Sequence, residues 1–251
     1  MELVISPTFT SMSTLLGLAL LAYLVVGEPL LGRWAYARLA RARGRDPRAL
    51  IRFFALSLAG EWGMAALVGA IALLAPGIRA ADLGIRAPSG ELNGFAAGLV
   101  GALVGGVALG VVMHRRAARG QPIPGQKRIA AMLPRTAGER ALGLAVALSA
   151  GICEELVYRG FAIALGVGLF GLPVAAAAAL SCAIFGVGHI YQGAAGAIAV
   201  TVLGGAFALL YVATGSLLLP VILHAVVDIR GLVLMPAPRG DDVANPGAHF
   251  G

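Results

Sequence analysis

Residues 140–165 read RALGLAVALSAGICEELVYRGFAIAL, an apolar run with three charged residues in its middle. A membrane-spanning helix needs roughly 17–25 predominantly apolar residues, so this run is long enough to cross a bilayer. The three charges are Glu154, Glu155 and Arg159. Ionisable residues inside a span are costly, so they usually pair with one another or mark a functional site. The run therefore predicts a membrane helix that carries a polar centre.

The composition of the whole chain is that of a membrane protein. Its 251 residues are 59% hydrophobic and 12% charged, with a mean hydropathy of +0.88. Soluble domains are about half apolar and about a quarter charged, so that class is excluded. The apolar runs lack the alternation of apolar and polar residues that a membrane β-barrel requires. We therefore expect an all-α, polytopic transmembrane helical bundle of about seven spans, with a range of about six to eight, around an intramembrane polar pocket.

Several stretches of the sequence are apolar and long enough, or nearly so, to cross a membrane. The stretches that we predict as spans are residues 12–32, 51–76, 92–113, 140–165, 172–190, 194–213 and 216–235. Residues 12–32 have the length of a signal peptide, but no basic segment precedes them and Glu28-Pro29 stands where a cleavage site would lie. We therefore expect a retained helix there.

Most of the basic residues lie in two connections between spans. Fourteen of the nineteen Lys and Arg residues fall between the first and second spans or between the third and fourth, when Arg52 and Arg140 at the start of the following spans are included. Basic clusters beside apolar runs determine topology, so they do not predict nucleic-acid binding. We expect both connections in the cytoplasm and the N-terminus outside, and the same charges can attract anionic headgroups. The Ala- and Arg-rich composition is typical of a bacterium with GC-rich DNA, which predicts a multi-pass protein of a bacterial plasma membrane.

The spacing of the charges within residues 151–160 predicts that only one of the two glutamates has a partner on its own helix face. Glu155 and Arg159 are four residues apart with the acid first, which places them on one helix face and predicts an ion pair. Glu154 is rotated by about 100° and has no such partner. We therefore expect one glutamate to be structural and the other to be free for chemistry. A packing role for all three charges is the alternative.

Two later spans carry further polar residues at helical spacing. Phe185 and His189 are four residues apart, and so are His224 and Asp228. Polar side chains in spans face the interior of the bundle or a water-filled cavity, so we expect these groups to converge on one pocket. A carboxylate beside a histidine can remove a proton from water, and a second polar pair can bind a developing oxyanion. The set predicts hydrolysis of a peptide bond by activated water.

Other polar residues are candidates of a different kind. Cys153 is an alternative nucleophile if a histidine lies beside it in the fold. Ser216 is interpreted as a helix N-cap, with a serine nucleophile as the alternative. Glu28 and Glu61 are the acidic residues of the first three predicted spans, and we assign neither a role.

The three motifs, in this order, resemble the signature of the CAAX-processing-type intramembrane endopeptidases, the Rce1-like (CPBP or Abi) family. That signature is EExxxR, FxxxH, and HxxxN or HxxxD on successive membrane helices. The chain has EELVYR at 154–159, FGVGH at 185–189 and HAVVD at 224–228. The resemblance covers about residues 138–235, and the first three predicted spans match no family.

The resemblance implies a membrane endopeptidase, CAAX prenyl protease-like, that acts on a membrane-anchored or membrane-associated peptide or protein. It implies that Glu154 is the general base and activates water together with His189. The residues that it assigns to the site are the catalytic Glu154, His189, His224 and Asp228 and the site-organising Glu155, Arg159 and Phe185. It places a catalytic helical core at 137–235. Hydropathy predicts N-terminal membrane helices with basic cytoplasmic loops at 1–136, and the Pro-, Gly- and Asp-rich composition predicts a disordered tail at 236–251.

Asp228 departs from the eukaryotic members of the family, which carry Asn there. An amide can donate to an oxyanion, whereas an ionised carboxylate cannot. We therefore expect Asp228 to orient His224 by accepting its ring N–H.

Other functions are compatible with the same residues. Glu154, His189 and His224 are the ligand types of a catalytic zinc site, although HExxH is absent from the chain. The preferred mechanism uses no cofactor, and zinc is the alternative. A non-catalytic membrane scaffold or immunity protein, and a proton-coupled transporter, are the alternatives that involve no hydrolysis.

Overall fold

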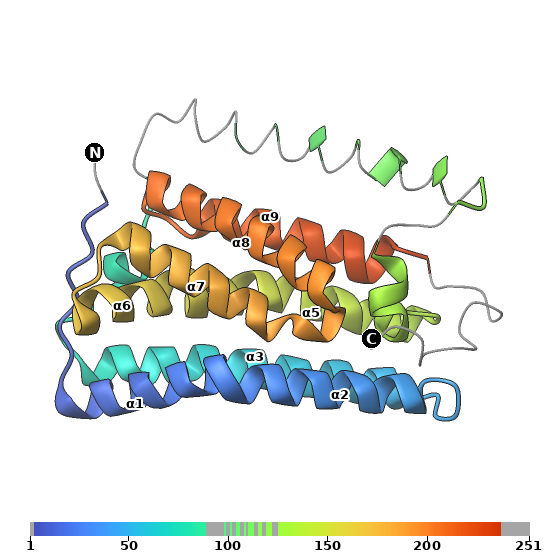
Figure 1. Cartoon of the computed structure of the whole chain (residues 1–251), viewed down its shortest axis with the longest axis horizontal. Coiled ribbons are helices and arrows are strands. Elements are labelled where there is room, and N and C mark those ends of the chain that lie inside the picture. The colour runs from blue at the N-terminus through green and yellow to red at the C-terminus, as the bar shows by residue number, and fades with distance from the viewer. Residues whose placement is uncertain are drawn as a thin grey trace.

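The computed structural model of the chain describes residues 3–88, 98, 101, 104–105, 108, 110–112, 115–116, 119–121 and 125–236. Within these residues the regular elements are helices and no strand occurs, which confirms the all-α prediction (Figure 1). Four of the described helices are long and apolar enough to cross a membrane. Most of the predicted third span (92–113), residues 122–124 and residues 237–251 of the predicted tail lie outside the described residues.

The first helical rod runs from Ser11 to Ala42. It consists of α1 (Ser11–Ala22), a π-helical segment η1 (Tyr23–Gly27) and α2 (Glu28–Ala42). The prediction of a first span that ends at residue 32 was therefore wrong about the end of the helix. The apolar run does stop there, but Arg and Leu favour helix, so the helix continues beyond the apolar part. Several arginines that were assigned to the connection lie on α2 instead.

The following elements fold back along this rod. α3 (Ala49–Leu74) packs against α1 and also against α5. A short helix, η2 (Ala80–Leu83), follows α3, and η3 (Gln126–Met132) precedes α5. α1, α2 and α3 form the layer along the lower side of the bundle in Figure 1.

The second long rod carries the EELVYR motif. It consists of α5 (Ala137–Glu154), a π-helical segment η4 (Glu155–Ala162) and α6 (Ile163–Phe170). At its start Thr136 accepts a hydrogen bond from the Glu139 amide, and the Glu139 side chain accepts one from the Thr136 amide, a capping box. The rod ends at Gly171, whose φ of 64° is left-handed and suits glycine.

Four further elements complete the bundle. They are α7 (Val174–Gly188), the short η5 (Ile190–Gln192), α8 (Ala194–Thr214), and α9 (Leu218–Asp228) with its π-helical extension η6 (Ile229–Leu234). α7 packs against α8, and α9 packs against α5. π-Helical segments are rare and frequent at functional sites, and all three in the described chain lie beside acidic residues of the membrane helices.

One hydrophobic core joins the helices before and after residue 136. Its fully or almost fully buried side chains include Leu20 of α1, Ile71 of α3, Val157 of η4, Ala177 of α7 and Tyr211 of α8. The N-terminal helices therefore pack directly on the part of the chain that carries the three motifs.

A buried ion pair fastens the same two parts together. Both terminal nitrogens of Arg43 donate to the Glu139 carboxylate at 2.8 Å, and the guanidinium also donates to the carbonyls of Ala131 and Leu133 at 3.1 Å. Arg43 is 7% exposed and Glu139 2% exposed. Four satisfied hydrogen bonds make this arginine a structural clamp rather than a surface charge.

A second clasp holds the N-terminal segment against η2. The Arg79 guanidinium donates twice to the Asp82 carboxylate at 3.0 Å, and the amides of Arg79 and Ser6 donate to it at 2.9 and 3.1 Å. Burial alone would raise the pKa of Asp82, but the hydrogen bonds from the Arg79 side chain and the two amides outweigh it. The pKa of Asp82 therefore lies below its ordinary value.

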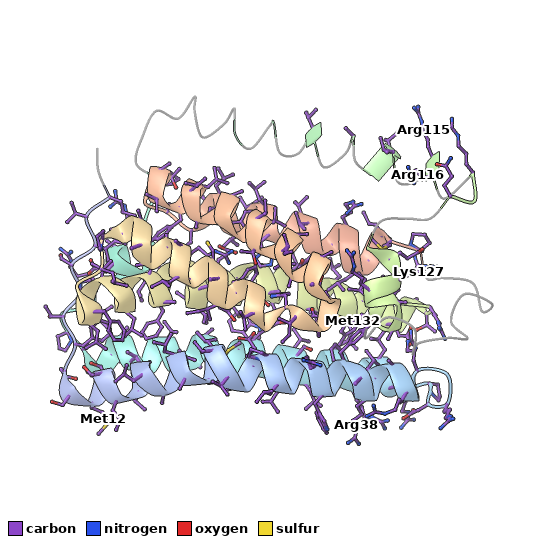
Figure 2. All side chains as sticks on the ribbon, in the orientation of Figure 1. Met12, Arg38, Arg115, Arg116, Lys127 and Met132 are labelled. Carbon is purple, nitrogen blue, oxygen red and sulfur yellow. The ribbon has the colours of Figure 1, made fainter. Side chains whose placement is uncertain are left out.

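Basic residues of the two Arg-rich connections and of α2 lie toward the same end of the bundle. Figure 2 shows Arg38, Arg116 and Lys127 toward one end and Met12 toward the other. This clustering is typical of a membrane protein that follows the positive-inside rule. The side on which each end lies stays a prediction.

Candidate active site

The predicted ion pair between Glu155 and Arg159 is confirmed. A terminal nitrogen of Arg159 donates to Oε1 of Glu155 at 2.8 Å, and both residues are completely buried. The sequence did not predict a second partner of Glu155. Nδ1 of His224, on α9, lies 2.7 Å from the same carboxylate oxygen. Glu155 therefore links the π-helical segment η4 to α9 as well as neutralising Arg159.

Among the described residues the hydrogen-bond partner of His224 is Glu155, and the ring N–H bond that we expected to Asp228 is not formed. The orientation of Nε2 by Asp228 stays a prediction. Since a carboxylate oxygen accepts, Nδ1 of His224 carries the hydrogen of the bond to Glu155. The other nitrogen, Nε2, lies 3.6 Å from Oδ2 of Asp228 and 3.6 Å from Oε2 of Glu154. Both separations are longer than a hydrogen bond, as contacts between catalytic groups often are before substrate binds.

His189 stands at the C-terminal end of α7. Its Nδ1 lies 2.8 Å from the carbonyl oxygen of Phe185, so Nδ1 donates and Nε2 remains an acceptor. The Phe185 ring contacts both histidines, with centroids 4.5 Å from His189 and 6.0 Å from His224. No hydrogen bond joins His189 to Glu154 in the described part of the chain. The predicted partnership of these two residues stays a prediction.

An aromatic wall surrounds the buried guanidinium. The Arg159 guanidinium carbon lies 4.3 Å from the ring centre of Phe185 and 5.8 Å from that of Phe207, and Phe207 also stacks on His224 at 5.4 Å. Two of the Arg159 nitrogens have no hydrogen-bond partner within the described part of the chain. Cation–π attraction offsets part of the cost of burying them. A Cβ at Gly204 would lie 2.7 Å from Arg159, so glycine is required for this close approach.

Three site residues escaped the sequence-based assignment. Phe207 is an ordinary aromatic of an apolar helix, and no signal in the sequence singles it out. Glu28 accepts a hydrogen bond from the hydroxyl of Tyr158, and Glu61 is 8% exposed with one carboxylate oxygen that has no partner among the described residues. The signal for both glutamates was their position inside predicted spans, which is a functional hint in itself.

The two alternative nucleophiles receive no support. Cys153 is a completely buried free cysteine. The Ser216 hydroxyl donates to the carbonyl of Arg86 at 2.7 Å and accepts from the Leu218 amide at 3.3 Å, at the start of α9. The N-cap of α9 is Leu217, so the prediction of Ser216 as the N-cap was wrong by one residue, although the Ser216 hydroxyl still accepts from the first amide of the helix.

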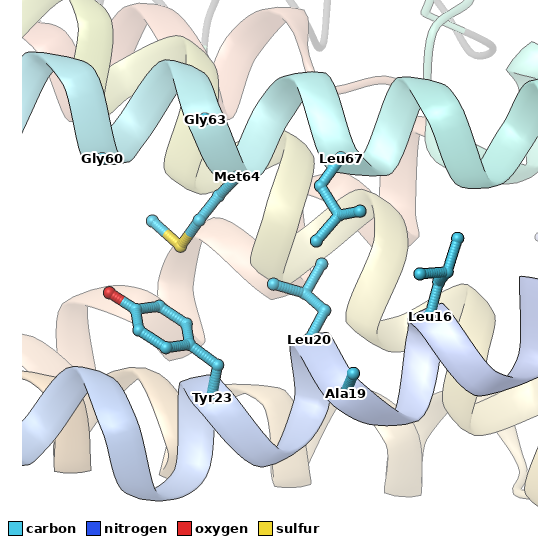
Figure 3. A pocket seen from close by; sticks show the side chains of 8 residues that line it. All are labelled: Leu16, Ala19, Leu20, Tyr23, Gly60, Gly63, Met64 and Leu67. Atoms are coloured by element: carbon cyan, nitrogen blue, oxygen red, sulfur yellow. The ribbon is translucent and has the colours of Figure 1, made fainter.

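Neither a preformed metal centre nor the apolar hollow of the bundle belongs to this site. Among the described residues, no three His, Cys, Asp or Glu side chains are placed to hold a metal ion. The part of the chain that the structure describes thus holds no preformed ligand set for the zinc alternative, which stays a prediction, and no step below is routed through a metal. A hollow of about 320 Å³ lies between α1 and α3 and is mainly apolar (Figure 3). The residues that line it are Leu16, Ala19, Leu20, Tyr23, Gly60, Gly63, Met64 and Leu67.

The fold and the site define a helical membrane protein with a buried centre of carboxylates, histidines and one arginine. Residues 136–230 match the family model described as type II CAAX prenyl endopeptidase Rce1-like, and this part of the chain is an Rce1-like domain. All three motifs lie within the matched residues, so the resemblance seen in the sequence is confirmed. No curated protein and no solved structure matches the chain.

Proposed function

We propose that the protein is an intramembrane endopeptidase that hydrolyses a peptide bond of a membrane-associated substrate. The observation that carries the proposal is the position of His224. Its Nδ1 is anchored on Glu155 at 2.7 Å, and its Nε2 points toward Glu154 and Asp228 at 3.6 Å each. Acid–base groups from two helices thus surround one point in an apolar bundle. The Rce1-like domain supports a protease activity of this kind.

Glu154 is the proposed general base. Its side chain is 15% exposed, whereas that of Glu155 is completely buried and occupied by Arg159 and His224. Oε2 of Glu154 has no hydrogen-bond partner among the described residues, so it is free to accept a proton from water. The water oxygen then forms a bond to the carbonyl carbon of the substrate, and Glu154 holds the proton.

His224 and Asp228 form the proposed oxyanion side. When Nε2 of His224 carries a proton, it donates to the oxygen of the tetrahedral intermediate. Asp228, on the same helix face, keeps that nitrogen directed into the site. The C–N bond then breaks, and the proton held by Glu154 moves to the leaving amine nitrogen. His189, with Nε2 as an acceptor, is proposed to hold the attacking water with Glu154.

The test compares the wild type with Glu154→Gln in detergent, on a library of membrane-anchored peptides, with and without a chelator. We expect the variant to cleave at least about 10²-fold more slowly, because a general base typically contributes about 10²–10⁴-fold. Asp46→Asn is the matched control, since Asp46 is an acid in the connection between α2 and α3. Wild-type cleavage by Glu154→Gln would refute the proposal. Activity lost with the chelator and restored by zinc would decide for the metal alternative.

A further inference from the structure

Glu28 lies outside the Rce1-like domain, on a helix face that packs against it. Glu28, Gly32 and Tyr36 are spaced by four residues and share one face of α2. A Cβ at Gly32 would lie 3.8 Å from the carbonyl oxygen of Gly188, and the Tyr36 ring lies 5.6 Å from the ring of Tyr191. This face of α2 therefore contacts the C-terminal end of α7 and the turn that follows.

Tyr158 joins Glu28 to the EELVYR motif. Its hydroxyl donates to Oε2 of Glu28, and the tyrosine is completely buried. A buried tyrosine hydroxyl requires a partner, and a carboxylate is a strong acceptor. The Tyr158 ring packs edge-on against Phe185 at 5.0 Å, and its carbonyl accepts from the Ser181 hydroxyl at 2.6 Å. Tyr158 therefore connects η4 to two points of α7, and Glu28 fixes its free end.

The Glu28 carboxylate also borders the histidine side of the site. A Cβ at Gly188, the residue before His189, would lie 3.4 Å from the Tyr158 hydroxyl and 3.7 Å from Oε1 of Glu28. Glu28 is within electrostatic range of both His189 and Glu154. The contact between Glu28 and Tyr158 thus lies between the segments that carry the proposed base and the first histidine.

We propose that Glu28 is a positioning residue of the active site, which holds η4 and the His189 end of α7 in register through its hydrogen bond with Tyr158. The proposal rests on the proposed endopeptidase function, and it extends the site to a helix before the Rce1-like domain. Loss of the acceptor leaves a buried hydroxyl unsatisfied and frees the two segments from their common anchor. Because Glu28 acts through the geometry of reacting groups, its loss lowers kcat and leaves KM nearly unchanged.

The test uses Glu28→Leu, Glu28→Gln, Tyr158→Phe and the double variant Glu28→Leu/Tyr158→Phe, with Asp46→Asn as the matched control. We expect Glu28→Leu and Tyr158→Phe each to lower kcat about tenfold or more, with KM within about threefold of wild type. Glu28→Gln keeps an oxygen that accepts the hydroxyl, so it restores most of the activity that Glu28→Leu loses. The double variant is no slower than Glu28→Leu, because both changes break one interaction.

Several results would overturn the assignment. Wild-type kcat in Glu28→Leu excludes a positioning role, and a double variant that shows the product of the two single losses excludes joint action. A Glu28→Gln enzyme as slow as Glu28→Leu shows that the charge matters and the hydrogen bond does not.

Thermal unfolding in detergent needs no substrate and separates the two proposals. If the wild type cleaves no peptide, the proposed function fails, and the catalytic role of Glu28 fails with it. If the double variant then lowers the unfolding midpoint by less than the sum of the two single shifts, Glu28 and Tyr158 stabilise the fold through one shared contact. If the shifts are additive, the contact is excluded as well.

Discussion

Replacing Arg159 by Met tests whether the buried network holds the site together. The substitution removes the guanidinium that donates to Glu155 at 2.8 Å. Among the described residues, it leaves that completely buried carboxylate with His224 as its one remaining hydrogen-bond partner. Breaking a buried ion pair by removing one partner costs about 3–5 kcal/mol. Loss of the cation–π contact with Phe185 at 4.3 Å adds about 1–2 kcal/mol. The apolar contacts of the Met side chain offset about as much free energy as the cation–π contact supplies, so the net loss of unfolding free energy is about 3–5 kcal/mol.

The expected result is a fall in the midpoint of thermal unfolding by about 6–20 °C, since each kcal/mol corresponds to about 2–4 °C at this chain length. The double variant Arg159→Met/Glu155→Leu should recover much of the loss, because apolar residues of similar volume often replace a buried pair without cost. Activity should be absent in both variants. Arg159→Met removes the positive charge beside the His224 site, and the double variant also removes Glu155, which anchors His224. Arg52→Met is the control, since Arg52 pairs with Asp46 at the surface. An Arg159→Met protein as stable as the wild type, or a double variant less stable than the single one, would refute the reasoning.

Three further predictions concern single features of the structure. Asp228→Asn should keep activity, because an amide of the same shape can still direct Nε2 of the neighbouring histidine, whereas Asp228→Leu should lose it; equal cleavage rates of the two variants would sink this role. Gly204→Ala should destabilise the protein by about 1–3 kcal/mol, because its Cβ would lie 2.7 Å from the Arg159 guanidinium and 2.9 Å from an aromatic carbon. Gly205→Ala, with open space at the same atom, should unfold at the wild-type midpoint, and equal midpoints for the two variants would contradict the packing argument. Asp82 should stabilise the fold above about pH 4, near the pKa of an aspartate in the unfolded chain, and this contribution should disappear as the pH falls through its lower folded pKa. Asp82→Asn should therefore reduce the pH dependence of the unfolding midpoint in acid, and an unchanged dependence would show that another group is responsible.

The sequence was sufficient for features that depend on one helix. The pairing of Glu155 with Arg159 follows from a spacing of four residues, and it occurs as expected. The bond between His224 and Glu155 joins residues 69 positions apart, and it depends on how α9 crosses α5. No local pattern contains that crossing, so the sequence indicated only Asp228, four residues from His224, and missed Glu155 as the partner of Nδ1.

The ends of the helices were also predicted only in part from the sequence. Hydropathy identified the apolar core of the first span, but the helix continues to Ala42 because helix formation in the polar part needs only favourable backbone propensity. The π-helical segments were also missed, since apolar periodicity gives no sign of a locally wider turn. The position of Glu28 beside Tyr158 depends on how the first rod packs against η4 and α7, which the sequence alone did not provide.

The clamp between Arg43 and Glu139 bears on how such proteins can diversify. Consider a chimaera whose first 136 residues come from one protein and whose Rce1-like domain comes from another. Such a chimaera must still bring an arginine and a glutamate together in the buried interior of the bundle. If either partner differs, the remaining charge is buried without a partner. The hybrid then folds less stably, whatever its catalytic residues are. The N-terminal helices and the domain are therefore expected to be inherited as one unit, with substitutions at these two positions appearing together.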